Sequence, residues 1–166
     1  DASSINTLSG SAADLNTAYA SSGISGLGNE AVNVNSGTAS TSQANTLAAD
    51  TSGVVTATIS DGDMATLAGL TETGNAYTIT ITDTSVAAAA LNALDGKTTV
   101  AINASNITTL TGSAADLNTA YASSGISNLG NEAVTLSDTT LAASVLNTLD
   151  GNTSGTINAS TINTLT

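Results

Sequence analysis

Gly10–Val32 reads GSAADLNTAYASSGISGLGNEAV, and Gly112–Val134 reads GSAADLNTAYASSGISNLGNEAV. The two segments lie 102 residues apart and differ at one position, which is Gly26 in the first and Asn128 in the second. The correspondence continues on both sides of the quoted segments. A long internal repeat is typical of chains that are built from stacked structural units.

A shorter period lies inside the long one. Ile79–Gly96 aligns with Val134–Gly151, and both segments end in Leu-Asn-x-Leu-Asp-Gly. We expect strands to begin near Val32, Val55, Thr78, Val100, Ala133 and Thr156. The spacing is about 23 residues except before Ala133, where a longer interval indicates an insertion around SAADLNTAYASSGIS. The approximate repeat units (coils) are therefore 1–31, 32–54, 55–76, 77–99, 100–131, 132–154 and a partial unit at 155–166.

Each unit has the pattern of a strand, a polar cap, a helix and a turn. Tyr77–Ile81 reads YTITI, in which apolar residues alternate with threonine as in a half-buried strand. The alanine-rich segment Val86–Leu94 places Val86, Ala90, Leu91 and Leu94 on one helical face. The small polar residues expected to act as helix caps are Asn35, Asp83, Asn103, Asp138 and Asn158.

Further capping signals come from the long repeat. Ser11-Ala-Ala-Asp14 and Ser113-Ala-Ala-Asp116 both resemble a capping box in which aspartate replaces glutamate. The Asp-Gly pairs at 95–96 and 150–151 are typical of a helix end, where glycine adopts the left-handed conformation.

These patterns predict an α/β repeat solenoid. One short strand and one short helix form each coil, the strands of successive coils pair in parallel, and about six coils form a single segment over residues 1–166. The alternative is an all-β solenoid without helices. The run Ala87–Ala90 favours the helical form, because alanine has the highest helix propensity.

The composition excludes several classes of function. The 166 residues include 13 acidic residues, one basic residue (Lys97), and no histidine or cysteine, so the net charge is −12. Without histidine or cysteine, the chain cannot form the usual zinc sites or a Ser-His-Asp triad. One lysine cannot offset a phosphate backbone, so we expect no nucleic-acid binding. The longest apolar run, Val86–Leu91, is too short to cross a bilayer, so we expect no insertion into a membrane. No catalytic motif is visible, and we expect the chain not to be an enzyme.

Acidic turns are the first candidate site. Asp61, Asp63, Asp95 and Asp150 lie at unit boundaries, and calcium prefers carboxylate oxygens, so calcium is the candidate ligand although no cofactor is required. The alternative is that these residues are caps and turn residues. Asp95 and Asp150 do not fit a capping role, because negative charge is unfavourable at a helix C-terminus.

Threonine rows are the second candidate site. We expect an exposed face that contains Thr56, Thr58, Thr78, Thr80 and Thr135 and resembles the flat threonine arrays of ice-binding proteins. The alternative is that threonine is simply favoured in strands. Tyr19 and Tyr121 occupy equivalent helix positions and are expected to fill the core.

The stretch Ser113–Thr166 resembles tandem arrays in the very large cell-surface proteins of marine picocyanobacteria, a group that includes surface proteins associated with swimming motility. The resemblance implies an extracellular or cell-surface location and a spacer or adhesive role, and it implies no catalytic residues. We therefore expect a stiff spacer or coat element within a large secreted or surface protein. The alternatives are a calcium-stabilised adhesin segment and an ice-binding face. The expected partners are neighbouring repeats of the same chain, with head-to-tail self-association as a further hypothesis.

Overall fold

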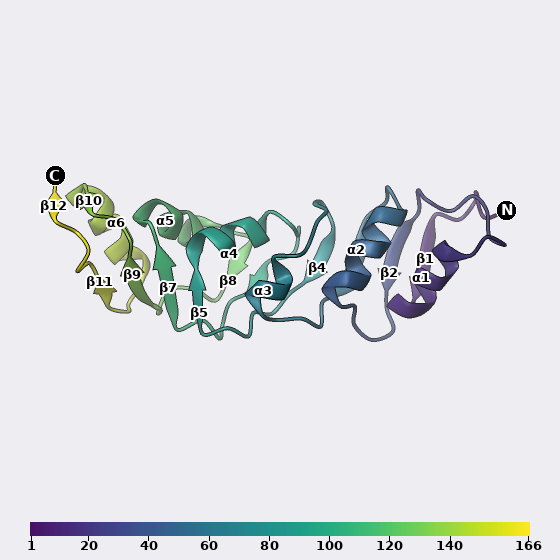
Figure 1. Cartoon of the computed structure of the whole chain (residues 1–166), viewed down its shortest axis with the longest axis horizontal. Helices are drawn as coiled ribbons and strands as arrows, with labels where there is room; N and C mark the ends of the chain where they lie inside the picture. Colours follow the sequence, from purple (N-terminus) through teal and green to yellow (C-terminus); the bar gives the residue numbers. More distant parts are fainter. The chain divides into compact units, whose positions relative to one another are not determined.

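The computed structural model describes all residues from Asp1 to Thr166 and contains twelve strands and six helices (Figure 1). The chain divides into two compact units. Unit 1 comprises Asp1–Ile79 with Gly96–Val100, and unit 2 comprises Thr80–Asp95 with Ala101–Thr166. All the strand pairs are parallel, so the predicted α/β class is confirmed.

Unit 1 contains one four-stranded sheet whose strands follow chain order, β1-β2-β3-β4. Thr7 lies opposite Ala31, Val32 opposite Val55, and Thr56 opposite Ala76. Helices α1 and α2 pack side by side along this sheet (Figure 1). The elements of unit 1 are β1 (Thr7–Gly10), α1 (Ala12–Ala20), β2 (Ala31–Val34), α2 (Thr41–Asp50), β3 (Val55–Thr58), α3 (Met64–Leu67) and β4 (Ala76–Thr78).

Unit 2 contains a four-stranded sheet in the order β11-β9-β7-β5 and two two-stranded sheets, β6-β8 and β10-β12. Its helices pack in sequence, α4 on α5 and α5 on α6. The elements are β5 (Ser85–Ala87), α4 (Ala88–Asp95), β6 (Ile102–Asn103), β7 (Thr109–Gly112), α5 (Ala114–Ala122), β8 (Ile126–Ser127), β9 (Ala133–Leu136), β10 (Thr140–Leu141), α6 (Ala143–Asn152), β11 (Ile157–Asn158) and β12 (Thr164–Leu165).

The 102-residue repeat is also a structural repeat. Helix α1 begins and ends 102 residues before α5, and α2 begins and ends 102 residues before α6. Strands β1 and β2 correspond in the same way to β7 and β9. The nearly identical segments Gly10–Val32 and Gly112–Val134 therefore form the same helix and lead into matching strands in the two units.

Strands lie within two residues of each of the six predicted starting points. The predicted insertion before Ala133, however, is wrong. The segment contains β7, whose Thr109 pairs with Ser85 on one side and with Ala133 on the other. Both intervals are 24 residues, so SAADLNTAYASSGIS belongs to an ordinary repeat and contains its helix α5. The spacing argument missed β7 because its sequence, TLTG, is short and has only one large apolar residue.

The core is narrow and mostly aliphatic. Its largest fully buried side chains include Tyr77, Leu47, Ile79, Leu91 and Leu117. Alternate residues of β3 are buried and exposed, as the period of two predicts. The aromatic core residue is Tyr77, which is 1 % exposed, whereas Tyr19 and Tyr121 are only half-buried.

The Tyr77 hydroxyl is buried without a hydrogen-bond partner. Burial raises the pKa of Tyr77 to about 12, so the phenol is neutral at ordinary pH. We expect Tyr77→Phe to raise the free energy of unfolding by about 1 kcal/mol, because it removes an unsatisfied polar group and preserves the shape of the ring. Urea denaturation of the two proteins measures the difference, and a loss of stability would show that the hydroxyl is hydrogen-bonded in solution.

Serine hydroxyls cap the helices of the long repeat. Ser11 Oγ accepts a hydrogen bond from Asp14 N at 3.1 Å, and Ser113 Oγ accepts one from Asp116 N at 3.1 Å. In each case the hydroxyl also donates to the aspartate carboxylate. The two predicted Ser-x-x-Asp caps are therefore confirmed. A reciprocal capping box at Ser40 and Gln43 begins α2 and was not predicted.

The predicted caps at Asn35, Asn103 and Asn158 are wrong, because none of these residues begins a helix. Asn103 and Asn158 each accept a hydrogen bond from the backbone N–H two residues later, as in an Asx-turn. Asp83 lies five residues before the start of α4. Strand β5 occupies the residues directly before this helix, so Asp83 is not at its N-cap position. Asn103 and Asn158 therefore begin turns, and Asp83 is not the N-cap of α4.

Asp138 does cap a helix, but not the one that follows it. Its carboxylate accepts a hydrogen bond at 2.8 Å from Ala114 N, the first residue of α5 in the preceding repeat. Asp61 acts in the same way on α2, since its carboxylate lies 2.7 Å from Thr41 N. Each of these helices is thus capped by its own serine and by an aspartate from the next repeat.

Candidate functional site

The four acidic residues predicted to bind calcium lie in different environments. Asp61 accepts a hydrogen bond from Thr41 N at the start of α2. Asp63 is the N-cap of α3, and the backbone and side-chain hydrogen bonds of Thr66 lower the pKa of its exposed carboxyl. Asp95 accepts a hydrogen bond at 2.6 Å from Ser123 Oγ, whereas Asp150 is exposed in the last part of α6.

The structure brings no three acidic side chains together in a group that could hold a metal ion. Three of the four predicted ligands are instead engaged one by one in hydrogen bonds with their own or a neighbouring repeat. The bond from Ser123 also gives a physical reason for an acidic residue at the C-terminus of α4. The unfavourable position of Asp95 on the helix dipole is offset by a hydroxyl donor from the next repeat.

We expect the melting temperature to be the same, to within about 1 °C, in millimolar calcium and in chelator, because these carboxylates already have protein donors. Circular dichroism during a thermal melt measures this. Magnesium at the same concentration controls for general ionic effects. An increase of several degrees that is specific to calcium would instead support a cation site among these residues.

Two buried glutamates form a site that sequence reasoning missed. Glu30 is 1 % exposed and Glu132 is 0 % exposed, although glutamate is rarely buried. The two residues are 102 positions apart, in the repeated tetrapeptide Gly-Asn-Glu-Ala that leads into β2 and into β9. The signal was available, because a glutamate directly before a buried strand occurs unchanged in both copies.

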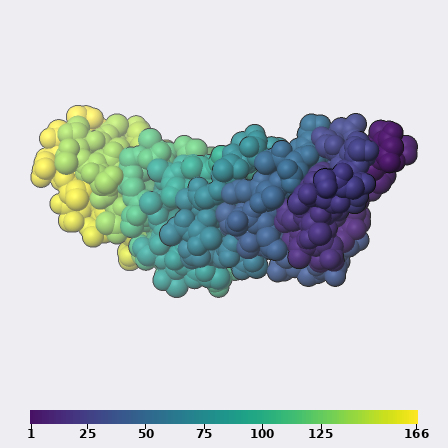
Figure 2. All heavy atoms as spheres, turned by 45° about the vertical axis from the view of Figure 1, so that its right-hand side comes forward, coloured from purple at the N-terminus to yellow at the C-terminus, as the bar shows by residue number.

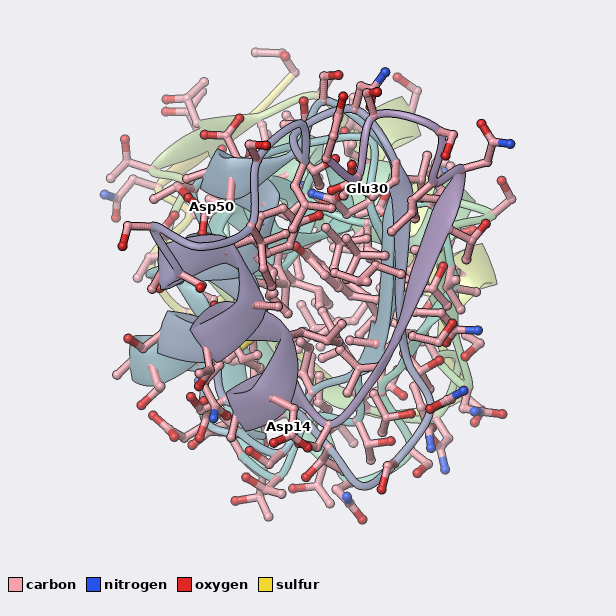
Figure 3. All side chains as sticks on the ribbon, turned by 90° about the vertical axis from the view of Figure 1, so that its right-hand side faces the viewer. Asp14, Glu30 and Asp50 are labelled. Atoms are coloured by element: carbon pink, nitrogen blue, oxygen red, sulfur yellow. The ribbon has the colours of Figure 1, made fainter.

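In unit 1, the Glu30 carboxylate is surrounded by hydrogen-bond donors. Gly28 N lies 2.9 Å and Asn29 N 3.2 Å from Oε2, while the Tyr19 hydroxyl donates to Oε1. Figure 3 shows Glu30 between the helical side and the strands, whereas Asp14 and Asp50 lie on the helical side. The carboxylate therefore closes the loop before β2 and links that loop to α1.

In unit 2, Glu132 makes the same arrangement with one difference. Gly130 N at 2.8 Å, Asn131 N at 3.2 Å and the Tyr121 hydroxyl at 3.2 Å all bond to Oε2. The second oxygen, Oε1, is buried and has no partner. Tyr19 and Tyr121 are thus not simple core residues as predicted, since each holds a buried carboxylate through its hydroxyl.

The electrostatics of the two sites follow from this geometry. Burial alone would raise the pKa of Glu30, but the donors from Tyr19, Gly28 and Asn29 outweigh it and lower the pKa. Burial raises the pKa of Tyr121 to about 12, with a further contribution from the Glu132 charge. Glu30 is therefore ionised at ordinary pH, and burial raises the pKa of its partner Tyr19, so the phenol stays neutral and suits a stable hydrogen bond to the carboxylate.

The hydrogen bonds of Glu30 and Glu132 hold the loops before β2 and β9 in place. The N–H and O–H donors around the Glu30 carboxylate and around Oε2 of Glu132 stabilise a negative charge and would repel a cation at the same oxygens. The loop is fixed from its other side by a threonine of the next repeat. Thr51 Oγ1 donates to the Glu30 carbonyl at 2.7 Å, and Thr153 Oγ1 donates to the Glu132 carbonyl at 2.8 Å.

The predicted threonine face is exposed but not regular. Thr56, Thr58, Thr78, Thr80 and Thr135 are all exposed. Along the sheet of unit 1, Thr58 lies beside Thr78, but Thr56 lies between Asn33 and Ala76. In unit 2, Thr135 lies between Thr111 and Asn158. The outward rows are therefore mixtures of threonine with asparagine and alanine.

Comparisons with known proteins give no relative. No family model, no curated protein and no solved structure matches the chain. None of its helices has the length and the hydropathy needed to cross a membrane.

Proposed function

We propose that this chain is a non-enzymatic structural segment of a large secreted or cell-surface protein, in which stacked repeats form a stiff spacer or coat. The observation that carries the proposal is the repeat itself. The nearly identical segments around α1 and α5 give the same helix 102 residues apart, and strands of successive repeats pair in parallel. Each added repeat can thus extend the chain by contacts with its neighbour alone.

The side chains also support this role. Several polar side chains form hydrogen bonds between one repeat and the next. These residues are Asp61, Asp138, Thr51, Thr153 and Ser123. The net charge of −12 and the exposed threonines favour a soluble surface that does not aggregate. The resemblance to the surface-protein arrays of marine picocyanobacteria supports the extracellular location.

Small-angle X-ray scattering tests the proposal. The comparison is between the 166-residue chain and a longer chain in which a second copy of residues 10–111 follows Thr111, so that the repeat stays in phase. We expect the maximum dimension to increase by about 20 Å, which is four strand spacings of roughly 4.8 Å, with an unchanged cross-sectional radius. A larger cross-section at an unchanged length would contradict the spacer function.

A further inference from the structure

Short turns with a leading hydroxyl group join four of the repeats to the repeats that precede them. These turns, which we call the hydroxyl turns, are Thr51–Gly53 after α2, Thr98–Val100 after α4, Ser123–Gly125 after α5 and Thr153–Gly155 after α6. In each turn the hydroxyl of the first residue accepts a hydrogen bond from the backbone N–H of the third. The same hydroxyl also donates a hydrogen bond to the preceding repeat, and the two kinds of acceptor found there differ in what they can distinguish.

The three threonine turns donate to the backbone of the preceding repeat. The acceptors lie 21 residues earlier, at 2.7 to 2.8 Å, and are the carbonyl oxygens of Glu30, Tyr77 and Glu132. The glycines that end two of these turns, Gly53 and Gly155, also lie against backbone atoms of the preceding repeat. Since every residue has a backbone carbonyl, these turns do not distinguish one preceding repeat from another.

The serine turn after α5 contacts a side chain instead. Ser123 Oγ donates to the carboxylate of Asp95 at 2.6 Å, 28 residues earlier and at the end of α4. A Cβ on Gly125 would lie 2.8 Å from Asp95 Cγ, so the turn needs glycine to leave room for the carboxylate. Helix α4 packs on α5, and the atoms of unit 2 follow chain order from teal to yellow in Figure 2. The contact therefore lies between two successive repeats in the interior of the chain.

The residue at the position of Asp95 differs among the helices. Five helices share an asparagine followed by two residues and then by this position, which we call the end position. It holds Tyr19 in α1, Ala48 in α2, Asp95 in α4, Tyr121 in α5 and Asp150 in α6. The two helices with tyrosine at the end position, α1 and α5, are each followed by a repeat with a threonine turn, whereas α4 is followed by the repeat with the serine turn.

We propose that Asp95 determines which repeat can precede α5. The serine turn fits a repeat with aspartate at its end position, because Ser123 needs a side-chain acceptor and Gly125 leaves room for a carboxylate. Alanine offers no acceptor, and a tyrosine hydroxyl at this position is bonded elsewhere, as Tyr121 is to Glu132. The threonine turns hold any pair of neighbours together, and the serine turn fixes their order.

Because a fixed order of repeats has meaning only in an array, this assignment rests on the proposed function. Scattering of the lengthened chain tests the array, and substitutions at the contact test the order. The two results are independent, since a chain that lengthens as expected can still lack a specific contact at Asp95.

A double-mutant cycle tests the contact. We expect Asp95→Ala and Ser123→Ala each to lower the melting temperature by about 5 °C, and the double variant to lower it no further, because the two residues share one hydrogen bond. Asp150→Ala is the matched control, since Asp150 is exposed at the end position of α6, and it should not lower the melting temperature. Additive losses in the double variant, or an equal loss in the control, would overturn the proposal.

Gly125→Ala tests the space for the carboxylate. The new methyl group forces the Asp95 side chain away from Ser123, so we expect Asp95→Ala to cause no further loss of melting temperature in a Gly125→Ala chain. If Asp95→Ala lowers the melting temperature as much in that chain as in the natural one, glycine is not needed for the contact and the proposal is wrong.

A helix exchange tests whether aspartate is sufficient to make a different repeat acceptable. Residues 88–95, AAALNALD, are replaced by the matching residues 41–48 of α2, TSQANTLA, or by TSQANTLD, which differs only at the end position. Both exchanges alter the core equally, so the difference between the two chains reports the aspartate alone. We expect the chain with aspartate to melt about 5 °C higher. Equal melting temperatures would overturn the proposal.

Discussion

Glu30→Ala is expected to lower the free energy of unfolding by about 3 kcal/mol or more. The substitution leaves Gly28 N, Asn29 N and the Tyr19 hydroxyl without their acceptor in a buried site. Urea denaturation measures the loss. Asp14→Ala is the control for general loss of an acidic residue, and it should cost about 1 kcal/mol as an exposed helix-cap residue. Equal effects of the two substitutions would show that burial of Glu30 contributes little.

The two copies allow a sharper comparison with glutamine. Both oxygens of Glu30 accept hydrogen bonds, so Glu30→Gln must place an amide N–H₂ group against a donor. In Glu132, all the donors bond to Oε2, and the amide of Glu132→Gln can turn its N–H₂ group toward the empty Oε1 position. We therefore expect Glu30→Gln to be the more destabilising of the two, by about 1 kcal/mol.

The same site makes stability depend on pH. Because the folded state lowers the pKa of Glu30, the ionised carboxylate adds stability above the ordinary glutamate pKa. That contribution is lost as the pH falls through the lowered pKa of the folded state. The difference in unfolding free energy between the natural chain and Glu30→Gln should accordingly shrink on acidification. A difference that stays constant down to the acid limit would contradict this.

Gly53→Ala is the second substitution with a large expected effect, again about 3 kcal/mol of destabilisation. A Cβ on Gly53 would lie 2.6 Å from the Glu30 carbonyl carbon and 2.9 Å from Ala31 N. These are backbone atoms at the start of β2, and the bond from Thr51 holds them in place. The clash can be relieved only by moving one repeat away from the next, which weakens the pairing of β2 with β3.

Gly151→Ala is the matched control. A Cβ on Gly151 meets nothing within 4 Å, and this glycine lies in α6. Alanine in a helix is favoured over glycine by about 1 kcal/mol, so we expect Gly151→Ala to be neutral or stabilising. Thermal and urea unfolding of the two variants measure the contrast. If Gly53→Ala is as stable as the unsubstituted chain, successive repeats can move apart at little cost in free energy.

Much of the fold could be predicted because its signals are local. The period of two in β3 and the serine caps of α1 and α5 depend on residues within one repeat, and the structure confirms them. The capping role of Asp138 was assigned to the wrong helix for the opposite reason. Its partner, Ala114 N, lies 24 residues earlier in the chain. An aspartate before a turn looks the same in sequence whether it caps its own helix or a neighbouring one.

The buried glutamates of the candidate site could not be predicted either, because their burial depends on contacts that the sequence pattern does not show. Charge and hydropathy predict that a glutamate is exposed, and only the surrounding donors make burial of Glu30 favourable. Two of those donors are backbone groups, which no residue pattern reports. Asp95 is a similar case, since its unfavourable place at a helix end is understood only once Ser123 lies beside it.

The caps supplied by Asp61 and Asp138 have a consequence for biosynthesis. A helix whose second cap lies 20 to 24 residues downstream cannot complete its N-terminus when its own residues first emerge. At about 5–20 residues per second, the ribosome needs roughly one to five seconds to deliver the missing aspartate. The first turns of α2 and α5 would therefore gain their second cap only when the next repeat arrives, and these two helices would be completed one repeat behind translation.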